Sequence, residues 1–186
     1  DSDGSHAMSG AEVQELLDAH AAAARRARDA GFQGVEVWAA YHSLVDQFWT
    51  PWSNRRTDQW GGSLENRTRF SRDLIARIRA DCGPDFIIGL AVSWSDAYPV
   101  LLSADELLAV LALHDATGDL DYVTVGAGSY LDFTRIIPPF TEPEALTPPF
   151  TARLTHLDGR KLDQFDLNNA DLAGRARSLV EAGQYS

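Results

Sequence analysis

Aromatic and titratable side chains lie at and just after the end of the first predicted strand, which the apolar run GVEVW places at residues 34–38. Trp38 and Tyr41 offer π faces, and such a face attracts an ammonium group by about 0.5–2 kcal/mol. His42 is a candidate base, because an unperturbed imidazole titrates close to neutral pH. Two other interpretations stay open: Trp38 as a large core residue at the end of a strand, and His42 as an exposed loop histidine.

Other motifs that carry chemistry are weak or missing. Gly126-Ala127-Gly128 begins like a dinucleotide-binding loop, but Leu131 stands where GxGxxG needs its third glycine. The sequence has no HExxH pair, Walker A motif or GxSxG elbow, and no metal is predicted. Cys82 is the single cysteine, which excludes an internal disulfide and is consistent with a cytoplasmic protein.

The composition is that of a globular domain. The chain has 186 residues, 45% of them hydrophobic, which is enough for one domain with a real core. Its net charge of −11 argues against nucleic acid and anionic membrane as partners. The longest apolar runs are far shorter than the roughly 20 residues that a membrane-spanning helix needs.

Hydrophobic periodicity and turn residues predict alternating helices and strands. Ser9, Ser63 and Ser103 are placed to cap three of the helices. Because helices separate the strands, the strands are expected to run parallel, with the chemistry at their carboxyl ends. The predicted elements are helices at 11–30, 64–82 and 104–117 and strands at 34–38, 86–93 and 121–127.

The stretch NRRTDQWGGSLENRTRF, residues 54–70, is unusually dense in charged residues for a surface loop. We expect a salt-bridged clamp that fixes the loop after the first strand onto the next helix, with Gly61 and Gly62 permitting the sharp turn. Solvated surface pairs of little energetic value are the alternative. The members of the expected clamp are Arg55, Arg56, Asp58, Glu65, Arg67 and Arg69.

This stretch also carries a resemblance. Together with AGFQGVEVWAAYHSLVDQFWTPWS before it, and with GPDFIIGLAVS and DYVTVGAGSY after it, it resembles the Old Yellow Enzyme family of FMN-dependent oxidoreductases. The loop and SYLDFTRIIPPF are most similar to the branch of trimethylamine dehydrogenase and the N-demethylases. The resemblance implies an α/β fold: part of a TIM barrel, with about three to four parallel strands and flanking helices.

The resemblance also implies roles for individual residues. In ene-reducing members an HxxH or HxxN pair and a following Tyr fill the positions of Trp38, Tyr41 and Ser43 here. Ser43 is a poor proton donor, so typical ene reduction is not expected. Trp38 and Tyr41 instead suit a methylated amine or betaine. His42 is the candidate catalytic residue of this loop.

Two further site residues follow the third strand. Tyr130 is assigned to substrate binding and Asp132 to catalysis, because amine-oxidising relatives hold the substrate amine there with an aromatic residue and an aspartate. Both assignments come from the resemblance.

Cofactor residues are partly missing. The family barrel has eight strands and about 250 residues, whereas this chain resembles only its central part. The last two strands, which build the FMN phosphate site in the family, have no counterpart. Ala91 replaces the arginine that the family places beside the flavin. FMN is therefore the expected cofactor, but no residue is assigned to it.

The chain divides into three segments in this interpretation. Residues 1–10 form a flexible start or a tag remnant, 11–150 the partial barrel, and 151–186 a divergent tail with one helix. Exposed sheet edges predict a homo-oligomer or a partner chain that completes the barrel. Two functions remain open: an FMN oxidoreductase, or part of one, acting on a methylated amine or betaine; and a flavin-free barrel fragment that binds or assembles.

Overall fold

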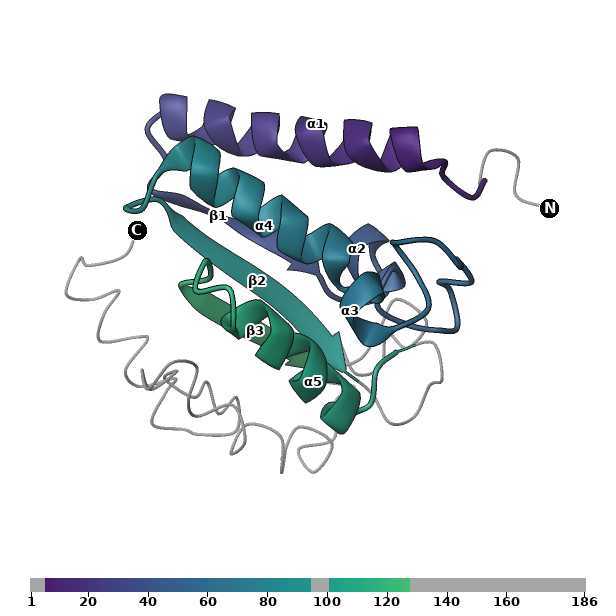
Figure 1. Ribbon diagram of the computed structural model, residues 1–186. Coiled ribbons are helices and arrows are strands. Elements are labelled where there is room, and N and C mark those ends of the chain that lie inside the picture. Colours follow the sequence, from purple (N-terminus) through teal and green to yellow (C-terminus); the bar gives the residue numbers. More distant parts are fainter. Residues whose placement is uncertain (1–5, 95–100, 128–186) are drawn as a thin grey trace, which may run out of the picture.

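Three parallel strands form the centre of the fold in the computed structural model, which describes residues 6–94 and 101–127 (Figure 1). The strands lie side by side in chain order, β1-β2-β3. The strands are β1 (Gly34–Ala39), β2 (Ile87–Trp94) and β3 (Tyr122–Ala127); the helices are α1 (Gly10–Asp29), α2 (Leu44–Gln47), α3 (Leu64–Arg67), α4 (Arg69–Cys82) and α5 (Ala104–Asp115).

Local capping explains where two of the helices begin. Ser9 opens α1 and Ser103 opens α5, each in a capping box with a glutamate three residues on, as the sequence predicts. Hydrogen bonds from the backbone and side chain of Ser9 lower the pKa of Glu12 to about 2. The capping contacts join residues that are close in sequence, so the starts of α1 and α5 can be predicted from the sequence.

The segment 64–82 differs from the prediction of one continuous helix. It is divided at Thr68 into α3 and α4. The hydroxyl of Thr68 donates to the carbonyls of Leu64 and Glu65, at 3.0 and 3.2 Å. Such side-chain bonds compete with the backbone ladder and bend helices. The stretch between the first predicted strand and the helix predicted at 64–82 also contains the short helix α2.

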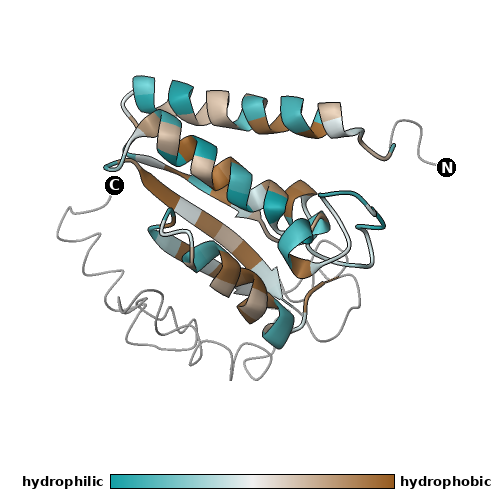
Figure 2. Cartoon of the chain, viewed as in Figure 1, coloured by the Kyte–Doolittle hydropathy of each residue, from teal (hydrophilic) through white to brown (hydrophobic). Residues whose placement is uncertain are grey.

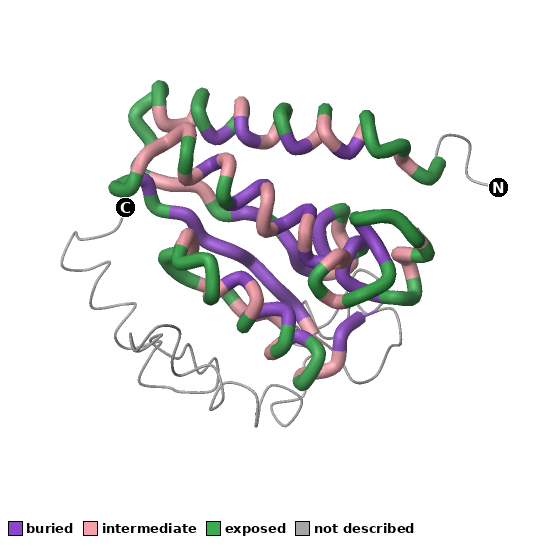
Figure 3. The backbone as a smooth tube through the Cα atoms, viewed as in Figure 1, coloured by how far each residue is buried: buried purple, intermediate pink, exposed green. Residues whose placement is uncertain are grey.

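The two faces of the sheet have different neighbours. Helices α4 and α5 lie over one face, with α1 packed beside α4 (Figure 1). Strand β2 is coloured mostly as hydrophobic (Figure 2), and it is buried over nearly its whole length (Figure 3). The core on this side includes Val37, Ile88, Leu90, Val92, Leu74 and Leu107.

The opposite face carries the alternate residues. The strand register brings Glu36 beside Gly89 and Tyr122, and Trp38 beside Ala91, with Thr124 on the far side of Ala91. Because side chains alternate along a strand, these residues share the face that the helices leave open.

Candidate substrate site at the carboxyl ends of the strands

Trp38 is an exposed aromatic residue near the end of β1. Its side chain is 46% exposed, whereas Trp49 and Trp60 are each 1% exposed in the core. The rings of Trp38 and Tyr41 meet edge to face, with 5.6 Å between centroids. Trp38 therefore lies outside the described core, and its ring contacts that of Tyr41, the other aromatic residue of the expected site.

Tyr41 extends across the sheet from the loop after β1. Its backbone N–H donates to Ser93 Oγ at 2.7 Å, which ties the loop to the end of β2. Its hydroxyl lies over β3, only 2.6 Å from the position that a Cβ on Gly126 would take. The absence of a side chain at Gly126 is what allows this approach.

A carboxylate that the sequence analysis did not select lies on the same face. Glu36 Oε2 accepts a hydrogen bond from Thr124 Oγ1 at 2.6 Å, across the intervening strand β2. The ring of Tyr122 covers Gly89, where an added Cβ would lie 2.2 Å from it. Burial, followed by the charge and hydrogen bond of Glu36, raises the pKa of Tyr122. The alternation in Glu36-Val37-Trp38 was the available signal.

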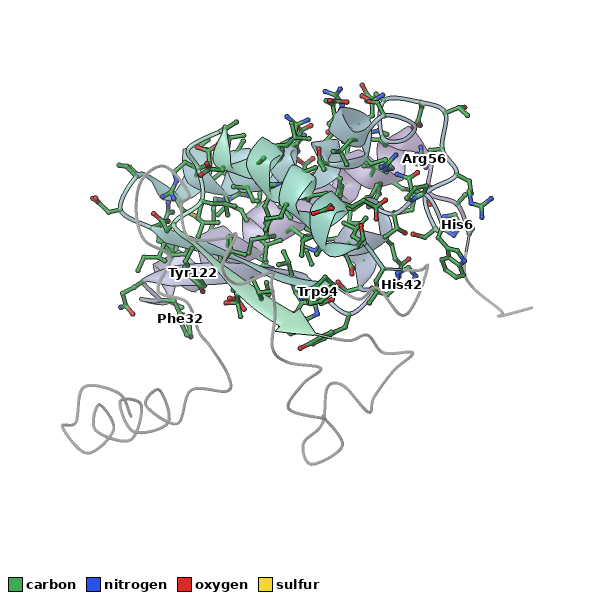
Figure 4. The ribbon with its side chains drawn as sticks, turned by 90° about the horizontal axis from the view of Figure 1, so that it is seen from below. His6, Phe32, His42, Arg56, Trp94 and Tyr122 are labelled. Atoms are coloured by element: carbon green, nitrogen blue, oxygen red, sulfur yellow. The ribbon has the colours of Figure 1, made fainter. Side chains whose placement is uncertain are left out.

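His42 lies at the same end of the sheet as Trp94, the last residue of β2, and far from Tyr122 (Figure 4). Its ring packs edge to face on Trp52 at 5.4 Å. Its Nδ1 is buried and has no hydrogen-bond partner among residues 6–94 and 101–127. Burial lowers the pKa of the imidazole, so His42 is neutral near pH 7.

The backbone between Trp38 and α2 makes an unusual turn. Tyr41 and His42 both have positive φ, 62° and 67°, although neither is glycine. Asp46, only 4% exposed, accepts from the backbone N–H of His42 at 2.7 Å and from Ser43 Oγ at 3.1 Å. Burial raises the pKa of Asp46 to about 6, and these hydrogen bonds oppose the rise.

The expected clamp at 54–70 exists, but it works mainly through backbone carbonyls. Arg67 donates to the carbonyls of Trp49 and Gly62, each at 2.6 Å, and Arg69 to that of Gln59 at 2.9 Å.

Ion pairing has a smaller part in this clamp than the sequence suggested. Arg56–Asp58 is its ion pair in the described part, and Glu65 forms none there. Gly62 has a positive φ of 83°, which is consistent with the sharp turn predicted at Gly61 and Gly62.

A separate cavity of about 480 Å³ lies between residues 6–8 and the loop after β1. Arg56 donates to the carbonyl of Met8 beside it. His6 and Arg56 lie at this side of the molecule (Figure 4). Its walls include Leu44, Phe48 and Asn54, and neither Trp38 nor Tyr41 contributes to it.

Two of the expected site residues and the expected C-terminal tail lie beyond the part of the chain that the structure describes. Tyr130 and Asp132, together with the tail 151–186, lie outside the described ranges. Within those ranges, no set of three His, Cys, Asp or Glu side chains is arranged to bind a metal. No helix there combines the length and the apolar character needed to cross a membrane.

Comparison with known proteins decides the family. Residues 2–135 match the NADH:flavin oxidoreductase / NADH oxidase family. The chain belongs to this family. N,N-dimethylglycine/sarcosine dehydrogenase of Chromohalobacter salexigens is 37% identical over 135 residues, which make up 71% of this chain and 20% of that protein.

Solved structures of family members agree with the fold. A 2-naphthoyl-CoA reductase is 32% identical with a TM-score of 0.64, over 67% of this chain and 19% of that one. An old yellow enzyme homologue from Zymomonas mobilis is 27% identical with a TM-score of 0.59, over 67% and 36%. The predicted partial TIM barrel is confirmed, and the chain spans only about a fifth to a third of these relatives.

FMN is the cofactor of this family, as the resemblance implied. The described residues do not form an FMN site by themselves. None of the three strands carries Arg or Lys, so they offer no side-chain cation for the phosphate. Tyr122 and Tyr41 already occupy the space over Gly89 and Gly126.

Proposed function

We propose that this chain is the central, substrate-binding part of a family oxidoreductase, and that it binds a methylated amine or betaine. The observation that carries the proposal is the arrangement on the open face of the sheet. Trp38 and Tyr41 form an aromatic pair there, and the carboxylate of Glu36 shares their face. Small-molecule binding at the carboxyl ends of parallel strands is typical of barrel enzymes.

A methylated ammonium group suits this face physically. Its methyl groups are attracted to aromatic faces, and its charge is attracted to a carboxylate. Glu36 forms no ion pair within the described residues, and its hydrogen-bond donors Thr124 and Tyr122 are neutral. A ligand cation would therefore supply the countercharge. For a betaine, the ammonium end would lie toward Glu36 and the carboxylate away from it, because like charges repel.

The remaining assignments extend this site. His42 stays the proposed base; the lowered pKa keeps its imidazole neutral and so able to accept a proton. Tyr130 and Asp132 stay proposed as a second aromatic wall and a second acidic group. FMN, the hydride acceptor of the family, would need contacts beyond the residues described in β1–β3.

A flavin-free binding or assembly protein is the second candidate. Two observations favour it: Ala91 provides no cation on β2, and the protein's own tyrosines cover the two glycines of the open face. In that case the same aromatic face would bind the amine without redox chemistry.

Two measurements test the proposal. Purified protein is titrated with FMN and followed by visible absorbance and flavin fluorescence, then mixed anaerobically with dimethylglycine. Bleaching of bound flavin supports the oxidoreductase, whereas amine binding without any flavin binding supports the second candidate.

The amine site is tested separately by calorimetry with tetramethylammonium and dimethylglycine. Trp38→Ala should weaken binding by roughly three- to thirtyfold, as expected for loss of one cation–π contact. Phe32→Ala is the control, because Phe32 is an exposed aromatic residue (65%) that precedes β1 and lies far from His42 (Figure 4). Equal affinities of the two variants would disprove the assignment of Trp38.

Self-association and a cytoplasmic location complete the proposal. In the described sheet, β1 and β3 each have one unpaired edge, and Phe32 and Ile87 are 65% and 45% exposed. Unpaired edges favour pairing with another chain. Light scattering that gives a compact monomer would contradict self-association. The single cysteine, Cys82, supports a reducing compartment, which fractionation of the source cells would test.

A further inference from the structure

We propose that Asp46 is a positioning residue: it holds the Tyr41–His42 turn in its left-handed form and so keeps Tyr41 over the sheet. This inference rests on the proposed function for its consequence in ligand binding. The claim that Asp46 stabilises the turn depends only on the contacts of the turn itself.

The Tyr41–His42 turn needs stabilising contacts from neighbouring residues. Residues with a Cβ rarely adopt positive φ, and two in succession, at Tyr41 and His42, form a strained local structure. Such strain persists only where the surroundings over-determine the conformation. Ser93 contributes one such restraint, because its Oγ accepts the N–H of Tyr41 at 2.7 Å.

Asp46 contributes the restraint on the other half of the turn. One carboxylate oxygen accepts the N–H of His42 at 2.7 Å, and the other accepts Ser43 Oγ at 3.1 Å. The neighbouring Gln47 donates to the carbonyl of His42 at 3.0 Å. The next helical turn therefore fixes both the N–H and the carbonyl of His42.

Burial strengthens the hydrogen bonds between the Asp46 carboxylate and the turn. Asp46 is 4% exposed, so water competes little for its oxygens, and a carboxylate is a stronger acceptor than a neutral group. The groups that face it are the backbone N–H groups of His42, Ser43 and Asp46 itself and the hydroxyl of Ser43; no ion pair to Asp46 occurs in the described part. Its buried charge is directed at the turn.

The turn controls where Tyr41 points. Without the Asp46 carboxylate, the backbone at His42 is free to return to negative φ. That change would alter the direction of the neighbouring residue Tyr41. The hydroxyl of Tyr41 would then leave its place over Gly126, and its ring would separate from Trp38. The aromatic pair proposed to bind the amine would be lost, although neither aromatic residue had been changed.

The first experiment detects the hydrogen bond from the backbone N–H of His42 to the Asp46 carboxylate. In ¹H–¹⁵N spectra of the whole chain, the amide proton of His42 should lie downfield and should shift with pH as the Asp46 carboxylate titrates. Asp46→Asn should abolish that titration, and Asp85→Asn, at an exposed aspartate, should leave it unchanged. An amide shift at His42 that follows pH equally in Asp46→Asn would overturn the proposal.

The second experiment reads the consequence with tetramethylammonium as the probe. Asp46→Ala should weaken binding roughly tenfold. Asp46→Ala/His42→Gly should recover most of the affinity, because glycine adopts positive φ without the carboxylate. Circular dichroism checks that both variants fold.

The outcomes separate the two proposals. If Asp46→Ala binds as the wild type does, or if the added glycine gives no recovery, the positioning role is wrong. If the wild type binds no amine while its His42 amide behaves as expected, the proposed function fails and the turn restraint stands.

Discussion

The indole N–H of Trp49 donates to Ser71 Oγ at 2.9 Å, inside the core. Ser71 Oγ in turn lies 2.8 Å from His114 Nε2, and His114 Nδ1 donates to the carbonyl of Val110 at 2.8 Å. The chain of contacts joins the loop after β1 to α4 and α5. The loop that carries Tyr41 is thus anchored in the core as well as at the surface.

Removing the central hydroxyl should destabilise the fold. Ser71→Ala leaves the indole N–H of Trp49 and Nε2 of His114 buried without partners, so we expect a loss of about 2–4 kcal/mol in the free energy of unfolding. Ser53→Ala is the control: Ser53 is also doubly hydrogen-bonded but only half-buried, and water can replace it, so we expect under about 1 kcal/mol. Urea unfolding measures both, and equal losses would contradict the buried network.

The pH dependence of stability should depend on two buried groups with opposite effects. Burial lowers the pKa of His114 to about 4, so its contribution is present above pH 6.5 and is lost as pH falls toward 4. Burial raises the pKa of Asp46 to about 6, so its contribution is present below pH 3.8 and is lost as pH rises through 6. Each amounts to about 3 kcal/mol, and they nearly cancel between pH 4 and 6.

Variants separate these two contributions. Asp46→Asn should lose about 3 kcal/mol more than the wild type when pH falls from 6 to 4. His114→Gln should instead gain stability over that interval, because only the Asp46 effect remains. Urea midpoints at pH 4, 5 and 6 measure the slopes. Parallel slopes for the two variants would show that neither group titrates as described.

The arginine clamp should depend on the shape of the guanidinium and not only on its charge. Arg67 reaches two carbonyls at once, on Trp49 and Gly62, through a planar fork with N–H groups in fixed directions, which a lysine ammonium lacks. Arg67→Lys should therefore cost about 1–3 kcal/mol of unfolding free energy. Arg55→Lys, at an exposed residue whose side chain donates to the carbonyl of Trp52 in the described part, should change it by less than about 0.5 kcal/mol. A harmless Arg67→Lys would mean that charge alone suffices.

Sequence reasoning predicted this clamp but mistook its partners. The charge pattern suggested ion pairs, yet the segment has four arginines to two carboxylates. A loop that turns repeatedly leaves carbonyls without backbone donors, and buried carbonyls require partners. The arginines satisfy that need. Ion-pair counting in a sequence cannot reveal it, because the free carbonyls appear only when the loop is folded.

The candidate site was also only partly predictable from the sequence. The two aromatic residues were predictable, since Trp38 lies at the end of a recognisable strand and Tyr41 follows it closely. The burial of Asp46 was not, because aspartate is usually exposed and the turn that engages it contains no glycine. Glu36 was overlooked although its alternation with Val37 placed it on the open face. The alternation of side chains along the strand separates its two faces, whereas the general apolar character of GVEVW does not.

A substitution on β3 offers the cleanest separation of binding from stability. Gly126→Ala would place a Cβ 2.6 Å from the hydroxyl of Tyr41, the far end of a movable side chain, so Tyr41 must shift while the backbone stays. We expect tetramethylammonium binding to weaken roughly threefold or more, with unfolding free energy changed by less than about 1 kcal/mol. Gly10→Ala is the control, because nothing lies within 4 Å of the added carbon. If Gly126→Ala binds the amine with unchanged affinity, Tyr41 has no part in the site, and Trp38 with Glu36 must account for it alone.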